Sequence, residues 1–230
     1  YSGVVFTLIE LYKVTQNSSY LHDAGEIAKK SPDTYLNHPY TFNSFFNGRS
    51  GSLLTLMHLH SVTHERWILP LINLFSKRII EAAKNGNFGL YWNGHTPNVR
   101  SPFGFLDGSA GIGYTFLELG HYFQNEAFYQ LAETAFSFQD HYWDGEKENW
   151  PDYNRDIKDA GTFQTHRNNF LQGNFDFFTE SDDTISYARG TGGIGLTRIR
   201  AYQLLHKPAY LNSVKAAFKK IKSALSKIQN

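Results

Sequence analysis

Residues 105–120 read FLDGSAGIGYTFLELG, in which Gly108 and Gly111 open an apolar run with helical spacing. The same glycine pair recurs at residues 48–51 and 190–193, and a fourth copy of the inner glycine is Gly3. An aromatic residue follows each inner glycine after 16 or 17 residues, just past a polar break: Tyr20, Trp67, Phe128 and Tyr210. Two landmarks in one register predict four αα-hairpin repeats, at about residues 1–30, 47–85, 107–142 and 189–229.

The two predicted helices of each repeat differ in kind. The first is short and apolar on most sides, as in residues 51–60, which predicts a buried helix. The second is amphipathic and should lie outside. Buried helices ringed by amphipathic ones predict an all-α fold, an α/α toroid, in a single domain. Glycines would let the inner helix ends crowd near a common axis, where a Cβ would clash. Residues 86–105 and 145–187 are predicted to be long loops.

Composition excludes several classes of protein. The chain has 230 residues, 41% of them hydrophobic and 19% charged, which is typical of a folded protein with a sizeable core. A formal net charge of +1 does not indicate binding to nucleic acid, and no apolar run is long enough to span a membrane. The absence of cysteine excludes disulfides, a cysteine nucleophile and thiolate metal ligands within these residues. Because the chain opens on Tyr1, we expect it to be part of a longer protein.

Three stretches in order resemble the lanthionine synthetase C-like family: residues 105–120, the tryptophan-proline-aspartate run at 150–152, and SYARGTGGIGL at 186–196. That family includes free-standing lanthipeptide cyclases and the C-terminal domains of bifunctional synthetases. The resemblance implies a toroid of seven αα-hairpins, of which this chain matches about four. It also implies bacterial lantibiotic biosynthesis in the cytoplasm, in which a cysteine of a modified precursor peptide adds to dehydroalanine or dehydrobutyrine and closes a thioether ring. A dehydratase, or the rest of a larger synthetase, would be a partner.

The sequence departs from the family at its metal site. The resemblance implies a zinc ion held by two cysteines and a histidine, but Ala188 stands at one cysteine position, and Asp107-Gly108 replaces a histidine-glycine pair. We therefore predict no metal site and no cofactor. His60 and His64 have helical i, i+4 spacing, yet no glutamate completes a metalloprotease motif beside them.

Three residues stand just before the glycine pairs and are predicted to form the rim of a central cavity: Asn47, Asp107 and Arg189. They are interpreted either as helix N-caps or as part of a positive well that favours a thiolate. In the second interpretation the catalytic residues are Asp107, protonating the enolate carbon, Arg189, and Tyr187, which would hydrogen-bond the oxyanion unless it only packs at the rim. The residues predicted to bind substrate are Asn47, Arg49, Trp92, His95, Trp150 and Asp152.

Two other functions stay open, and with them whether the chain is an enzyme. One is a zinc-less, non-catalytic member that binds a precursor peptide or a partner enzyme. The other is an α/α-toroid glycosidase or lyase, which needs paired carboxylates about 5–9.5 Å apart. Asp107 and Asp152 are the pair that the sequence offers for it.

Overall fold

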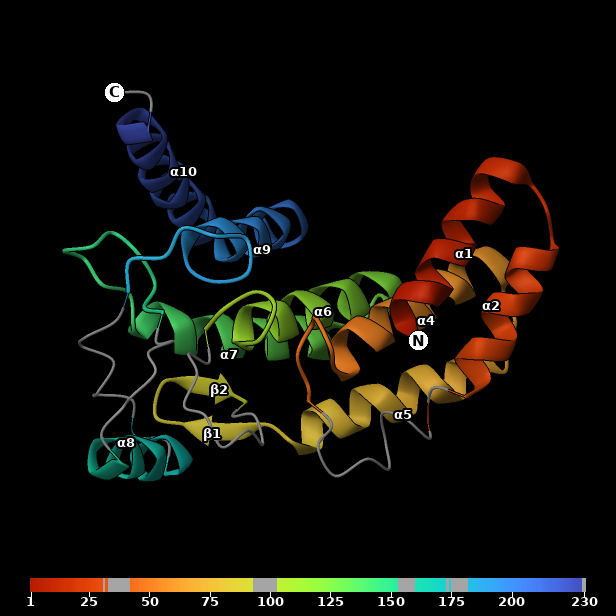
Figure 1. Ribbon diagram of the computed structural model, residues 1–230, viewed down its shortest axis with the longest axis horizontal. Helices are drawn as coiled ribbons and strands as arrows, with labels where there is room; N and C mark the ends of the chain where they lie inside the picture. The colour runs from red at the N-terminus through yellow and green to blue at the C-terminus, as the bar shows by residue number, and fades with distance from the viewer. Residues whose placement is uncertain are drawn as a thin grey trace. The chain divides into compact units, whose positions relative to one another are not determined.

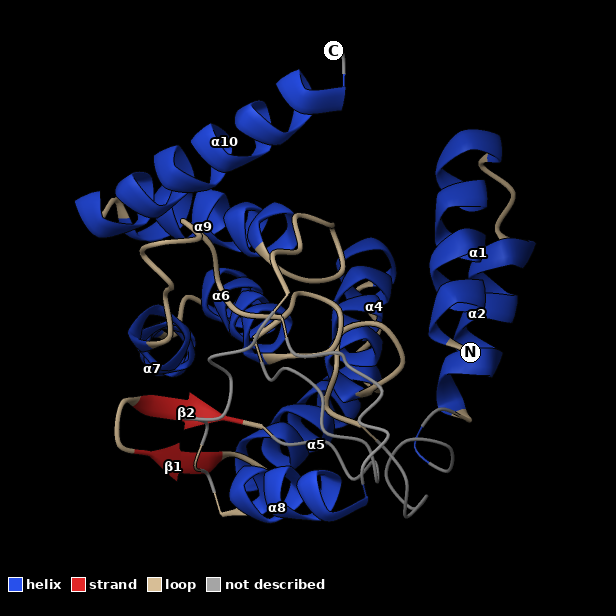
Figure 2. Cartoon of the chain, turned by 60° about the vertical axis from the view of Figure 1, so that its left-hand side comes forward, coloured by secondary structure: helices blue, strands red, loops and turns tan. Residues whose placement is uncertain are grey.

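The structure is a computed structural model that describes residues 1–30, 32, 42–92, 103–152, 160–172, 174 and 182–228. Over these residues the protein is mostly helical, with a single small antiparallel sheet (Figures 1 and 2). It divides into two compact units, residues 1–82 and 83–230, and each is described by itself. That the chain forms one domain stays a prediction.

The N-terminal unit consists of two helix pairs. Helices α1 (Ser2–Thr15) and α2 (Ser19–Lys29) form the first, and α4 (Arg49–Thr63) and α5 (Ile68–Glu81) form the second. α1 packs on α4, where the Ser2 and Ser52 hydroxyls lie 2.7 Å apart. The large side chains that are fully buried come from α1, α4 and α5: Ile9, Leu53, Leu59, Ile68, Phe75 and Ile79.

The C-terminal unit begins with a β-hairpin and continues with five helices among the described residues. Strand β1 (Lys84–Gly86) pairs with β2 (Gly89–Tyr91), and Lys84 lies opposite Tyr91. The helices are α6 (Ser109–Phe123), α7 (Glu126–His141), α8 (Ala160–Leu171), α9 (Thr191–Leu205) and α10 (Pro208–Ile228). α6 contacts both α7 and α9, α10 packs on α9, and β2 lies against α7. One core cluster joins these elements: Tyr91, Phe103, Ala110, Phe138, Trp150, Ile194 and Ala217.

The predicted difference between the two helices of a pair is present in the C-terminal unit, in α6 and α7. α6 buries ten of its fifteen residues, among them Phe116 and Leu119, and so lies in the interior. Its partner α7 instead buries one stripe, which includes Ala132, Ala135 and Phe136. In the N-terminal unit the two helices of a pair differ little, since α4 buries six of its fifteen residues and α5 five of its fourteen. The prediction of a buried first helix is wrong for α1, which buries Val5 and Ile9 of its fourteen residues. None of the helices in the described ranges is both long and apolar enough to cross a membrane.

The glycine pairs are required by the loops that precede them. A Cβ on either glycine of two pairs would lie less than 3.0 Å from the carbonyl oxygen six residues upstream. The glycine and carbonyl partners are Gly48 with Phe42, Gly51 with Phe45, Gly190 with Thr184, and Gly193 with Tyr187. The predicted clash is therefore present, but its main partner is the preceding loop and not another helix end. Each loop folds back over the start of its own helix.

Main-chain groups cap these helices, so the N-cap interpretation of Asn47 and Asp107 is wrong. The N-cap residues of α4, α6 and α9 are Gly48, Gly108 and Gly190, with no capping hydrogen bond from a side chain. An amide in the first turn instead donates to the carbonyl seven residues upstream. These bonds run from Arg49 to Phe42 at 2.9 Å, from Ala110 to Phe103 at 3.4 Å, and from Gly193 to Ser186 at 3.2 Å. The side chains just before the glycines are left without a capping role.

A third landmark of the repeat was not predicted. The first helix of every pair ends in a non-glycine residue with left-handed backbone: Gln16, His64, Gln124 and His206, with φ between 51° and 58°. Each lies thirteen residues after the inner glycine. The Gln16 and Gln124 side chains donate to the carbonyls of Lys13 and His121 and so satisfy a helix end. His64 meets the ring of His60 edge-on at 6.4 Å, so these histidines belong to a helix terminus.

Two predicted loops contain regular structure. The region 86–105 begins inside the β-hairpin, whose strands of three residues are too short for apolar alternation to be visible. Within 145–187 lies α8, which has no apolar periodicity because it is polar on most sides. Two local side-chain bonds run along it, from Thr165 Oγ1 to the Gly161 carbonyl at 3.0 Å and from the Gln164 amide to Asn168 Oδ1 at 2.9 Å.

Candidate functional site

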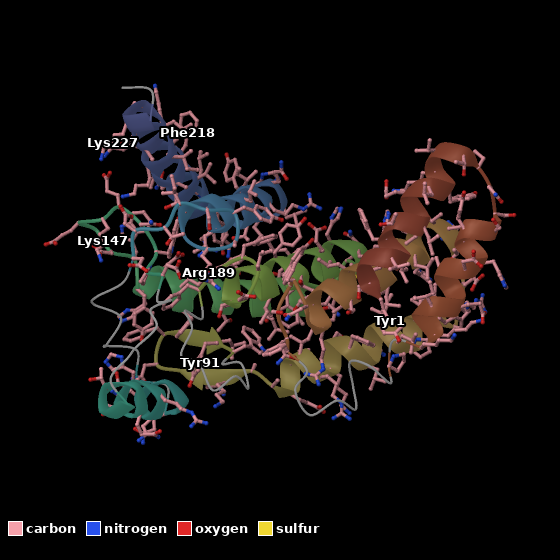
Figure 3. All side chains as sticks on the ribbon, viewed as in Figure 1. Tyr1, Tyr91, Lys147, Arg189, Phe218 and Lys227 are labelled. Atoms are coloured by element: carbon pink, nitrogen blue, oxygen red, sulfur yellow. The ribbon has the colours of Figure 1, made fainter. Side chains whose placement is uncertain are left out.

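The loops that precede α6 and α9 meet and bring two of the predicted residues together. The Leu106 amide donates to the Ala188 carbonyl at 3.1 Å. The residues that follow, Asp107 and Arg189, then form an ion pair, with Asp107 Oδ2 3.3 Å from Arg189 Nη2. Their side chains are 27% and 22% exposed, so both groups still reach solvent. Arg189, labelled in Figure 3, lies in the loop before α9.

Asp152 joins this pair from a third segment. It is 4% exposed, and its backbone carbonyl accepts from the Asp182 amide at 2.7 Å. Burial raises the pKa of the Asp152 carboxyl. A hydrogen bond to Thr184 and the charge of Arg189 oppose this shift, whereas the charges of Asp182 and Asp107 add to it. Among the described residues, Asp152 Oδ1 has no hydrogen-bond partner.

Tyr187 stands at the edge of the cluster. Its ring is 53% exposed and meets Phe105 edge-on, with ring centroids 5.1 Å apart. Phe105 also meets Tyr114 edge-on, with ring centroids 5.7 Å apart. Partial burial raises the pKa of Tyr187, and burial beside Glu118 raises the pKa of Tyr114 to about 12. Both phenols therefore keep their proton near neutral pH, and Tyr187 can donate a hydrogen bond to a group outside the protein.

The cluster of Asp107, Asp152 and Arg189 combines three chemical capacities. Its guanidinium favours an anion next to it. Asp107 is a reachable carboxylate that can accept or return a proton. Asp152 is a buried carboxyl with a raised pKa and a free acceptor atom, the combination that marks functional acids and bases in proteins. The sequence placed Asp152 among the substrate-binding residues, whereas its burial fits a role behind the other two.

The described residues do not fit the zinc ion that the family resemblance implies. Ala188 offers no side-chain donor, and its carbonyl already accepts from Leu106. The neighbouring Arg189 brings a positive charge, which disfavours a second cation there. Over the described ranges, no three histidine, aspartate or glutamate side chains are grouped as a metal site would need.

Two predicted substrate-binding tryptophans are core residues. Trp92 is 4% exposed and packs on Phe116 at 6.0 Å. Trp150 is 1% exposed, and its indole Nε1 donates to Asp140 Oδ1 at 3.3 Å. Large aromatic rings stabilise the core because they bury a large apolar area. The position of a tryptophan in the sequence does not show whether its ring is buried. His95, which was predicted to bind substrate, lies outside the described residues.

Asn47 and Arg49 belong to the N-terminal unit. Asn47 Oδ1 accepts from the Ser44 hydroxyl at 2.7 Å. Arg49 Nη1 donates to Asn43 Oδ1 at 2.9 Å, and burial lowers the pKa of the Arg49 guanidinium. Because the two units are described separately, a rim shared by Asn47, Asp107 and Arg189 stays a prediction.

Three supporting residues of the cluster were not predicted: Phe105, Asp182 and Thr184. Phe105 packs edge-on against Tyr187. The Asp182 amide donates to the backbone carbonyl of Asp152, and Thr184 forms a hydrogen bond with the Asp152 carboxyl. Their contacts join segments about thirty or eighty residues apart. The sequence signal for them is limited to a phenylalanine before Asp107 and a polar run at 182–184.

Comparison with known proteins gives one match in sequence. The model of the lanthionine synthetase C-like protein family matches residues 1–230 and therefore covers both units. No curated protein matches the sequence significantly.

Solved structures match the chain in fold. The α-1,6-mannanase GH76A from Salegentibacter sp. HEL1_6 aligns with a TM-score of 0.61 and 13% identity, over 96% of this chain and 59% of the mannanase. The chain thus spans less than two thirds of that enzyme. Nisin cyclase aligns with a TM-score of 0.49 and 14% identity, over 98% of this chain and 69% of the cyclase. Cellobiose 2-epimerase from Spirochaeta thermophila DSM 6192 aligns with a TM-score of 0.46 and 13% identity, over 95% of this chain and 72% of the epimerase. The fold class is an α/α toroid, which confirms the prediction.

Proposed function

The chain belongs to the lanthionine synthetase C-like family, and on this premise we propose that it binds a dehydrated precursor peptide and closes thioether rings in it. A cysteine thiol of the peptide would add to dehydroalanine or dehydrobutyrine. The observation that carries the proposal is the Asp107–Arg189 ion pair beside Asp152. It occupies the two loops that correspond to the histidine-glycine and aromatic-cysteine motifs of the family.

The first step is deprotonation of the thiol. A free cysteine has a pKa of about 8.5, so an adjacent cation increases the thiolate fraction near neutral pH. Arg189 supplies that cation, and the reachable carboxylate of Asp107 accepts the proton. The sulfur then bonds to Cβ of the dehydro residue, and the electron pair of the double bond moves onto Cα and its carbonyl as an enolate.

The second step returns the proton. Tyr187 donates a hydrogen bond to the enolate oxygen, where negative charge develops. Asp107 then gives the proton to Cα, so the S–H bond is replaced by S–C and C–H bonds and the peptide keeps its mass. Asp152 does not touch the substrate in this scheme. Its buried carboxyl sets the charge around Arg189 and is a positioning residue.

The setting of this reaction is part of the same proposal. The precursor peptide must first be dehydrated at serine or threonine, so a dehydratase, as a separate enzyme or in the rest of a larger synthetase, supplies the substrate. We place the reaction in the bacterial cytoplasm, in lantibiotic biosynthesis.

The test uses a dehydrated peptide that carries one cysteine. Ring closure leaves the mass unchanged but removes a free thiol, so the peptide loses one N-ethylmaleimide adduct in mass spectra. We expect the purified protein to accelerate this loss. Asp107→Asn should slow it by about a hundredfold because the proton carrier is lost, and Arg189→Gln by a similar factor, about a hundredfold.

The matched control is Arg200→Gln. Arg200 lies on α9, the helix that follows Arg189, and pairs with Glu118 of α6 at 2.6 and 2.9 Å, outside the cluster. This variant should keep the wild-type rate per folded molecule. A peptide that binds by fluorescence anisotropy but keeps its thiol would instead assign the chain to the non-catalytic members.

A second candidate rests on the two carboxylates. Asp107 and Asp152 interact electrostatically, one reachable and one buried with a raised pKa, as a glycosidase acid and base require. Incubation with α-1,6-linked mannan oligosaccharides and a reducing-end assay tests this activity. New reducing ends that disappear in Asp107→Asn would favour the glycosidase over the cyclase.

A further inference from the structure

A cavity of about 330 Å³ lies in the C-terminal unit, apart from the cluster described above. Its walls come from the end of α7, the segment that follows it, and α10. The lining residues are Asp140, Trp143, Trp150, Asn212, Ser213 and Ala216. Its size suits a small ligand and not a whole peptide.

The walls of the cavity are tied together. The turn between Trp143 and Trp150 is closed by two hydrogen bonds between Asp144 and Asn149, at 2.9 and 3.2 Å. Lys220 on α10 donates to the Lys147 carbonyl at 2.6 Å and fixes the turn to this helix. Lys147 is labelled in Figure 3, on the turn that α10 holds. The cavity is therefore formed in advance of binding.

Two tryptophans form an aromatic corner in it. The rings of Trp143 and Trp150 lie 4.6 Å apart with an interplanar angle of 75°. Trp150 is anchored in the core, whereas Trp143 is only partly buried. Trp143 thus offers the aromatic surface that a ligand can cover.

The polar side of the cavity is uncharged overall. Asp140 Oδ1 accepts from Arg198 Nη2 at 2.8 Å, and Arg198 is fully buried behind it. This guanidinium balances the carboxylate. Within the described part of the chain, Asp140 Oδ2 accepts no hydrogen bond and the Asn212 side chain makes none. The cavity thus offers a free acceptor, and an amide that can donate and accept.

These features select the chemistry of the ligand. A cationic ligand would gain little electrostatic attraction in this cavity, because Arg198 already neutralises the charge of Asp140. A purely apolar side chain would cover Asp140 Oδ2 and Asn212 without bonding them, which costs free energy. A neutral ring that has hydroxyls on its edge and C–H groups on its face satisfies both sides. We propose that the cavity is a binding site for one or two sugar units, stacked on Trp143 and hydrogen-bonded to Asp140 and Asn212.

The test is a titration of the whole chain with neutral sugars: glucose, galactose, mannose, N-acetylglucosamine, maltose and cellobiose. Tryptophan emission reports stacking, and saturation-transfer NMR identifies the sugar protons that contact the protein. Titration to about 50 mM covers a Kd of about 1 mM. Trp143→Ala should raise the Kd of the sugar that binds by about tenfold. Asn212→Ala, on an exposed helix face, should raise it by about threefold.

Matched variants control for indirect effects. Trp67→Ala removes a tryptophan of the N-terminal unit, and Asn73→Ala removes an exposed asparagine of α5; neither should change the Kd. The proposal is overturned if no sugar binds, or if Trp143→Ala and Asn212→Ala bind as the wild type does. It is also overturned if indole binds in the cavity in place of every sugar. Loss of ring-closing activity has no bearing on these outcomes, because the cavity lies outside the Asp107 cluster.

Discussion

Asp152 is a carboxyl in surroundings that disfavour its charge. A carboxyl that is 4% exposed, with one oxygen unpaired among the described residues, resists ionisation. Its raised pKa means that the folded protein holds this proton more tightly than the unfolded chain does. Its contribution to stability is thus fully present below the ordinary aspartate pKa of about 3.9 and is lost as the pH rises through the folded value.

Asp152→Asn tests this directly, since an amide never ionises. The free energy of unfolding of the variant minus that of the wild type should therefore be larger at pH 7 than at pH 4, because only the wild type loses stability as the pH rises. Urea unfolding of both proteins at the two pH values measures the difference. Asp23→Asn, which changes an exposed aspartate of α2, should show a smaller dependence on pH. If the variant and the wild type differ in free energy of unfolding by the same amount at both pH values, Asp152 does not have a raised pKa in the folded protein.

At this scale the sequence predicted part of the site. Asp107 and Arg189 could be found because each precedes a glycine pair in the same register, and the two loops then pair. The burial of Asp152 next to them could not be predicted. Its partners Asp182 and Thr184 lie about thirty residues further along the chain, and no periodic pattern links them to it. Nor does a single tryptophan in a sequence distinguish a ligand contact from a core residue, as Trp150 demonstrates.

At the scale of the helices, the inner glycine has different surroundings in different repeats. A Cβ on Gly193 would clash with the Tyr187 carbonyl and with Phe105, whereas a Cβ on Gly3 would meet nothing within 4 Å. Gly193→Ala should therefore lower the free energy of unfolding by about 3 kcal/mol or more. Gly3→Ala should raise it by about 0.5–1 kcal/mol because alanine favours the helix. Thermal unfolding of both variants measures this, and similar effects at the two positions would refute the role of the loop.

Helix pairs were predictable and their exceptions were not, for a physical reason. Burial of an apolar face imposes a period of 3.6 residues, and this period is visible in α7 and α10. α8 has no such face because its residues are polar on most sides, so it leaves no periodic signal. The left-handed helix ends were missed because glutamine and histidine are not the residues that usually adopt this backbone.

At the scale of the molecule, the core cluster of the C-terminal unit draws all of its members from residues 91–217. We therefore expect a fragment of residues 83–230 to fold without the N-terminal unit. Far-UV circular dichroism should show a helical spectrum, and urea should unfold the fragment in one cooperative transition. Dispersed amide signals in NMR spectra would separate this state from a collapsed one. A fragment without a cooperative transition would mean that its core depends on residues 1–82.

The main-chain caps of α4, α6 and α9 have a consequence for how this scaffold can change. Backbone carbonyls start these helices, so replacing the side chain at 47, 107 or 189 takes nothing from the helix itself. Asparagine, aspartate and arginine occupy those three places, and each of the three helices still begins at a glycine with a main-chain bond to the preceding loop. Evolution can accordingly exchange a metal ligand for a charged pair there, and acquire or abandon a reaction, while the architecture stays intact.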